Sequence, residues 1–177
     1  MIKLNGIGAS GALAAGIVKI FQRDILDITH KIIEDTSAEL ERLETAKRKT
    51  ISDIDEDYKK VLESSDEEVA GIFEMHALMI EDKEFNCSIA EKISVEKMNA
   101  EYAVFITGEE FAARFSSMDD EYMQARAADV KDISKRLIKN LIGHAENSQS
   151  IKSSVIIASD DLTPSETVSL PKDKILA

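Results

Sequence analysis

The sequence predicts a mostly helical α+β protein, with a four- to five-helix block inserted into a small α/β domain. Between residues 36 and 142, apolar side chains recur mostly three or four apart, and short polar turns separate the periodic stretches. Compact runs of β-branched residues at 17–21 and 155–158 lie on either side of that block and favour strands. The helices should form a bundle of two helical hairpins.

The first segment, residues 2–22, is interpreted as two short strands around a loop of glycine, alanine and serine. The loop GIGASG contains residue types that could cradle a phosphate. No helical pattern follows it, however, so it does not match a dinucleotide fingerprint. Turn geometry that requires positive φ is the favoured interpretation.

Four helices are predicted next along the chain. Thr36, followed three residues later by Glu39, is a capping-box pattern that starts a helix of about seven turns. A second helix covers roughly 66–82, a shorter one lies near Glu84–Ile93, and Ser94 starts another that reaches about Phe115.

The last long helix is predicted at Asp119–Arg136. Asp119 and Asp120 can cap its first N–H groups, and Gly143 supplies the C-terminal stop. Arg126 interrupts the apolar stripe and must find anions. It forms either an ion pair on the helix surface or a contact to a phosphate or a partner protein.

After Gly143 the pattern changes to that of an α/β domain. Val155–Ala158 should be a buried strand, and Pro164 occupies the first position of a helix. Lys174–Ala177 resembles the opening of another strand, so we expect the sequence to be a fragment. The predicted division is listed in chain order: an α/β part at 1–30, the helical subdomain at 31–143 and a truncated α/β part at 144–177.

Composition and charge restrict what the chain can bind. The 34 Asp and Glu residues outnumber the 22 Lys and Arg, which gives a formal net charge of −12. This charge argues against binding to nucleic acid or an anionic membrane and favours a basic partner. The single cysteine, Cys87, excludes an internal disulfide and a multi-cysteine zinc site. No apolar run approaches the roughly 18 residues that span a bilayer, so we expect a cytoplasmic protein.

The helix at 66–82 contains the most notable histidine. His76 lies on its apolar side, where it is either a buried, hydrogen-bonded residue or a contact in a partner groove. No Glu precedes His76 or His144 by three residues, so the di-metal pattern Glu-x-x-His is absent and we predict no metal site. Methionines and acidic residues flank the same helices. An apolar strip with an acidic rim suits a basic protein partner.

Five stretches carry a family resemblance. They are GIGASGALAAG near the start, IFEMHALMIEDKEF at 72–85, NAEYAV at 99–104, MDDEYMQARAADVKDISKRL at 118–137 and VIIASDDLTPSETVSL at 155–170. Together they resemble, over nearly the whole chain, enzyme I of the bacterial phosphoenolpyruvate:sugar phosphotransferase system, the phosphoenolpyruvate-protein phosphotransferase family. The family usually has Ser-Pro-Gly in the first loop, whereas this chain has Ser10-Gly11-Ala12.

The resemblance implies a phosphoryl relay for sugar uptake. In the family, phosphoenolpyruvate and Mg²⁺ bind a C-terminal barrel, and a histidine passes the phosphoryl group to the carrier protein HPr. That histidine lies in a Gly-Gly-x-Thr-Ser-His segment shortly after the strand that begins here at Ile175, so it is absent from this chain. We therefore expect a fragment that retains HPr docking, holds no cofactor and is inactive alone. The family's homodimer contacts lie in the C-terminal part.

Family position also assigns roles to residues that are present. Thr167 would hydrogen-bond the absent acceptor histidine and orient it. The HPr-docking surface would comprise Glu67, Glu68, His76, Met79, Asp82, Glu84, Phe115, Met118, Met123 and Arg126. Two alternatives stay open: a free-standing helical protein-interaction module, and an enzyme I paralogue that serves a different phosphocarrier.

Overall fold

The computed structural model describes residues 11, 13–21, 26–63, 67–143, 151 and 153–176, with the backbone alone for Glu67 and Glu68. The described elements, in chain order, are β1 (Ile17–Ile20), α1 (Thr36–Glu63), α2 (Glu67–Glu81), α3 (Lys83–Ser94), α4 (Ala100–Ser116), α5 (Glu121–Ile142), β2 (Val155–Ala158), α6 (Pro164–Ser169) and the 3₁₀ helix η1 (Lys172–Lys174). The predicted mostly helical α+β fold is confirmed.

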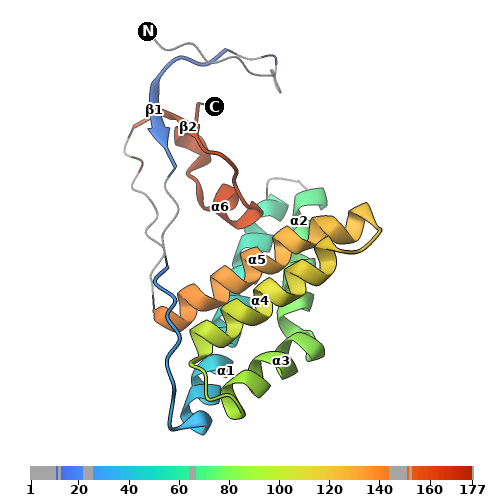
Figure 1. The fold of residues 1–177 in the computed structure, drawn as a ribbon. Coiled ribbons are helices and arrows are strands. Elements are labelled where there is room, and N and C mark those ends of the chain that lie inside the picture. The colour runs from blue at the N-terminus through green and yellow to red at the C-terminus, as the bar shows by residue number, and fades with distance from the viewer. Residues whose placement is uncertain are drawn as a thin grey trace.

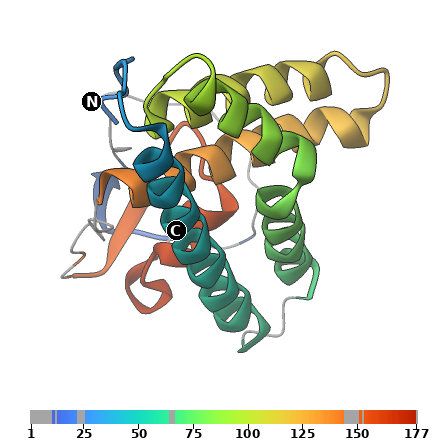
Figure 2. The same ribbon diagram turned by 90° about the horizontal axis from the view of Figure 1, so that it is seen from below.

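The five long helices form one bundle. Helices α4 and α5 lie side by side as an antiparallel pair, with β1, β2 and α6 beyond one side of them (Figure 1). Seen from below, α1 and α2 form a second antiparallel pair (Figure 2). The apolar faces of the long helices share one core. Its largest fully buried apolar side chains are Phe73, Ile54, Ile80, Ile89, Ile93, Ile133, Leu137 and Ile138. In the part of the chain that the structure describes, no helix is both long and apolar enough to cross a membrane.

The two strands join distant parts of the chain. β1 and β2 pair in parallel, with Ile17 opposite Val155 and Ile20 opposite Ala158, so the helices lie within the connection between neighbouring strands. The strand expected from Lys174 is reduced to a single bridge at Ile175, because η1 occupies the preceding residues. The expected strand at the start of the chain and most of its glycine-rich loop lie outside the described residues.

The helix ends confirm some predicted caps and correct others. Asp120 accepts a hydrogen bond from Met123 N–H at the start of α5, and Gly143 ends that helix with φ 74°. The Thr36 capping box is wrong, because Ala38 N–H donates to Asp35 instead.

The predicted start of α4 is also wrong. Ser94 ends α3, and a turn follows in which Lys97 has φ 55°. The next helix begins at Ala100.

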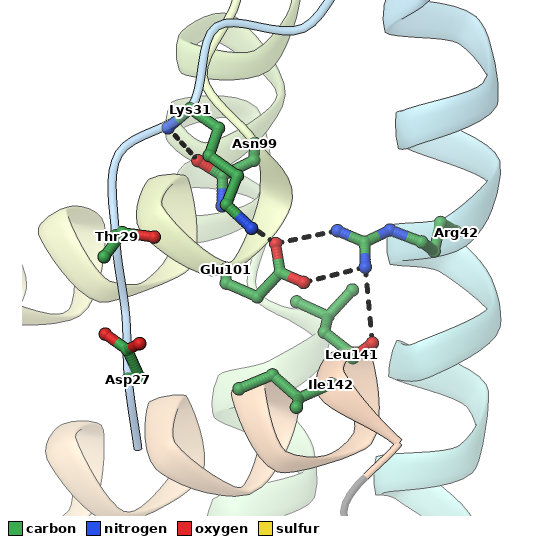
Figure 3. Close-up of a pocket in the computed structure, with 8 residues that line it drawn as sticks. All are labelled: Asp27, Thr29, Lys31, Arg42, Asn99, Glu101, Leu141 and Ile142. Atoms are coloured by element: carbon green, nitrogen blue, oxygen red, sulfur yellow. Dashed lines mark hydrogen bonds and ion pairs between the residues drawn. The ribbon is translucent and has the colours of Figure 1, made fainter. Parts of the chain in front are cut away.

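Arg42 ties four segments together (Figure 3). Its guanidinium donates to both carboxylate oxygens of Glu101 on α4, at 2.7 Å each, and to the Leu141 carbonyl at the end of α5, at 3.3 Å. Asn99 donates to Glu101 and accepts from Lys31 N–H, which attaches the segment before α1. A bidentate arginine–carboxylate pair fixes orientation as well as distance, so this junction aligns α1, α4 and α5.

Helices α4 and α5 approach closely at Gly108. A Cβ atom there would overlap Ser134 Oγ on α5 and lie 2.9 Å from Ser134 Cβ. Gly71, on the exposed side of α2, has no atom within 4 Å of the corresponding position. Substitution at Gly71 therefore tests helix propensity alone, whereas substitution at Gly108 also tests the packing of α4 against α5.

We predict opposite effects for the two alanine substitutions. Gly71→Ala should raise the free energy of unfolding by about 0.5–1 kcal/mol, because alanine loses less backbone entropy in a helix. Gly108→Ala should lower it by about 1–3 kcal/mol, because the methyl group forces α4 and α5 apart. Urea denaturation measures both; stabilisation by Gly108→Ala would contradict the close contact.

The Glu101 junction should make stability depend on acid pH. Burial alone would raise the pKa of Glu101, but hydrogen bonds from Arg42, its own backbone and Asn99 lower that pKa to about 2. The carboxylate therefore stabilises the fold fully above about pH 4.5, and this contribution is lost progressively as pH falls from there through about 2.

We expect Glu101→Gln to remove about 1–2 kcal/mol of unfolding free energy at pH 7 and only about a quarter of that near pH 2.5, after allowance for partial solvent screening. Glu109, in an exposed pair with Lys131, is the control, and Glu109→Gln should change stability by less than about 1 kcal/mol. Urea titrations at the two pH values test this, and an equal loss at both would refute it.

Candidate functional site

An apolar groove of about 320 Å³ opens between four helices of the bundle. It is lined by Met75, Leu78, Met79, Asp82, Glu84, Phe85, Phe111, Phe115, Val130 and Ile133. These residues come from α2, the start of α3, the end of α4 and the middle of α5, with Asp82 between α2 and α3.

Helix α2 supplies the outer wall of the groove through its side-chain periodicity. Met75, Leu78 and Met79 are three and four residues apart and share one face. Leu78 is 63% exposed, which is costly for an isolated leucine in water. The groove therefore presents an uncovered apolar centre to solvent.

The floor and far wall of the groove are closely packed. Val130 and Ile133 of α5 are buried in the core, at 2% and 1% exposure. Phe85 and Phe111 pack edge to face with ring centres 5.3 Å apart, which joins α3 to α4. The groove is thus preformed by core packing.

Two carboxylates line the groove, and each has a structural contact of its own. Asp82 caps α3 by accepting a hydrogen bond from Phe85 N–H at 2.8 Å. Glu84 pairs with Arg114 at 2.8 Å, and both side chains are largely exposed. An exposed pair of this kind is weak, so a lysine or arginine of a bound partner can replace Arg114 at Glu84.

His76 does not lie on the surface, contrary to the expectation of a direct contact. It is fully buried on the core side of α2, where its ring packs edge-on against Phe73. Its Nε2 atom lies 3.4 Å from the Asp129 carboxylate on α5. The helical period explains the correction, because position 76 shares the face of Phe73 and Ile80.

Asp129 also holds Arg126, the arginine singled out from the sequence. The Arg126 guanidinium donates to Asp129 at 2.8 Å and to the Tyr122 hydroxyl, and it stacks 4.4 Å from the centre of the Tyr122 ring. Burial would raise the pKa of Asp129, but His76 and Arg126 outweigh it and keep that pKa below its ordinary value. Arg126 is therefore braced within α5, with 19% of its side chain exposed.

The structure gathers only part of the predicted docking set. Met79, Asp82, Glu84 and Phe115 line the groove. Met118 is exposed in the turn before α5, and Met123 is half-buried on the first turns of that helix. Glu67 and Glu68 start α2, but their side chains lie outside the described residues.

Sequence reasoning missed Leu78 and Asp129. Leu78 falls outside the stripe that buries α2, and its three-residue spacing from Met75 was the available signal. Asp129 contacts His76 across two helices, and no sequence spacing signals such a contact.

Thr167 occupies a separate place, on α6. It is exposed, and its Oγ1 donates to the Thr163 carbonyl at 3.0 Å. Thr163 and Glu166 form a complete capping box around the start of this short helix. Among the described residues, no group of three or more His, Cys, Asp or Glu side chains could hold a metal ion.

Comparison with known proteins shows which family the chain belongs to. The family model for the PEP-utilising enzyme, N-terminal, matches residues 5–126. The phosphoenolpyruvate-protein phosphotransferase of Bacillus subtilis (strain 168) is 36% identical over 174 residues, and that of Geobacillus stearothermophilus is 37% identical over 175. These matches cover 98% and 97% of this chain but 30% of each relative.

Solved structures agree with this placement. An NMR structure titled as Enzyme I (nEIt) superposes with a TM-score of 0.77 and 29% identity, over 91% of this chain and 66% of that one. A structure titled N-terminal domain of Enzyme 1 - Nitrogen has a TM-score of 0.70 at 22% identity, which shows a shared fold. By sequence and by fold, the chain belongs to the family of PEP-utilising enzyme N-terminal domains and resembles that part of enzyme I.

Proposed function

We propose that this chain is the carrier-docking portion of a phosphoenolpyruvate-protein phosphotransferase, and that its groove binds the phosphocarrier HPr. The observation that carries the proposal is the apolar surface of exposed Leu78 and half-buried Met79, beside the carboxylates of Asp82 and Glu84. A basic protein with an apolar knob complements such a surface. Two relatives, 36% and 37% identical to this chain over the aligned residues, are named phosphoenolpyruvate-protein phosphotransferases, and that name supports a protein as the partner.

The residues present favour docking over phosphoryl transfer in this chain. Since a side chain is needed to accept the phosphoryl group, and none of the three histidines fits the family motif, we propose that the chain alone transfers no phosphate. The chain spans about 30% of its curated relatives. We therefore assign phosphoenolpyruvate, Mg²⁺ and the dimer contacts to the remaining length of a parent protein in the cytoplasm.

Thr167 fits the role of orienting an acceptor imidazole. Its hydroxyl proton is used by the Thr163 carbonyl, so its lone pairs remain to accept a hydrogen bond. An imidazole nitrogen that donates to Thr167 is protonated, which leaves the lone pair on the other nitrogen to attack phosphorus. The tautomer of the acceptor histidine would thus be set by α6.

If the groove binds HPr, shortening the Leu78 side chain should lower the affinity for HPr. Leu78→Ala should weaken HPr binding by roughly 10- to 30-fold, since burial of a leucine side chain contributes about 1.5–2 kcal/mol. The folded chain should be little affected because Leu78 is already exposed. Titration of labelled HPr into the chain, monitored by fluorescence anisotropy, measures the affinity.

Val95 provides the matched control. It is 72% exposed just beyond the end of α3 and does not line the groove. Val95→Ala should leave HPr affinity unchanged, whereas raising the salt concentration should weaken binding of the unsubstituted chain because the rim is acidic. Absence of binding, or equal effects of both substitutions, would refute the docking site. Phosphoenolpyruvate added to the same samples should leave the chain unlabelled.

A further inference from the structure

Helix α6 is too short to be stable alone. It has six residues, and isolated helices below about 12–15 residues are marginal in water. Its capping box satisfies the first N–H groups but fixes only its internal shape. The contacts that α6 makes with the helical bundle must therefore fix its orientation.

Two polar contacts join α6 to α5. Ser165 Oγ donates to Asp132 Oδ2 at 2.7 Å, and Asp132 is only 5% exposed. Lys135 Nζ lies 3.2 Å from Glu166 Oε1, with 27% and 12% of the two side chains exposed. Asp132 and Lys135 are three residues apart, so both project from one face of α5 towards α6.

Glu166 belongs to both the cap and the contact with α5. One carboxylate oxygen accepts from Thr163 N–H at 3.0 Å, and the other accepts from Lys135. Thr167 is the next residue, and its N–H and hydroxyl both donate to the Thr163 carbonyl. A shift of Lys135 or Asp132 would therefore move the backbone that holds the Thr167 hydroxyl.

Two neighbouring turns of α5 carry both the residues that line the groove and the residues that contact α6. Val130 and Ile133 form part of the groove, while Asp132 and Lys135 contact α6. Val168 adds an apolar contact, since it packs against the bundle core. The groove and the helix that carries Thr167 are thus both attached to α5, and α6 also contacts α1.

We infer that Asp132 and Lys135 are positioning residues that hold α6, and with it Thr167, in a fixed orientation to the docking groove. The inference rests on the proposed function for the role of Thr167. It adds that the bundle supports the Thr167 hydroxyl as well as the docked partner. A hydrogen bond to a buried carboxylate and a partly buried ion pair are strong enough to order one short helix.

The test compares a double variant, Asp132→Ala with Lys135→Met, with the unsubstituted chain by NMR. In the unsubstituted chain, residual dipolar couplings of the N–H bonds at 165–168 should fit the same alignment tensor as those of α5. The double variant should show reduced couplings there, and amide exchange at these residues roughly tenfold faster or more. The couplings of α5 and the urea midpoint should stay the same.

Two controls separate positioning from general stability. Asp132→Asn keeps an acceptor oxygen for Ser165, so it should retain the couplings of α6. Lys131→Met removes an exposed pair between α5 and Glu109 of α4, and it should not affect α6. Unchanged α6 couplings in the double variant, or a lower urea midpoint with α6 still ordered, would overturn the inference.

An HPr titration on the same samples distinguishes this inference from the proposed docking. Affinity for HPr should remain within about twofold in the double variant, because none of the changed residues lines the groove. If the unsubstituted chain fails to bind HPr while α6 loosens as expected, the docking proposal falls and the positioning of α6 stands.

Discussion

The bidentate contact between Arg42 and Glu101 is the constraint on which the arrangement of the bundle depends. Arg42 reaches from α1 to α4 and to the Leu141 carbonyl near the end of α5, while Asn99 extends the network to the segment before α1. Apolar packing brings helices together but tolerates sliding, whereas a forked pair of hydrogen bonds fixes one register. Two of these helices, α4 and α5, also line the groove, so its shape depends on that register.

The groove combines a floor of buried core residues with an exposed apolar wall. Phe85, Phe111 and Ile133 are positioned by core packing, but Leu78 remains largely in solvent. This distribution costs stability in the isolated chain, because apolar surface is left in contact with water. Burial of the same surface against a protein partner recovers that free energy, which is the physical reason to interpret the groove as a docking site.

Electrostatics at the site are local. The overall charge is −12, yet the groove carboxylates are each engaged, Asp82 as a helix cap and Glu84 in a weak pair with Arg114. Arg126 is neutralised by Asp129, which also approaches the buried His76. An acidic surface can steer a cationic partner, whereas His76 and Asp129 join α2 to α5 behind the groove.

The sequence by itself determined which segments are helical, where α5 starts and stops, and the family, because periodicity, caps and motifs are local properties. It also supplied four of the groove residues through family position. Only the tertiary structure decided that His76 is buried, that Leu78 is exposed, and that Asp132 and Lys135 hold α6. Burial and ion pairing depend on which helix faces are brought together, and the packing of residues distant in the chain sets those faces.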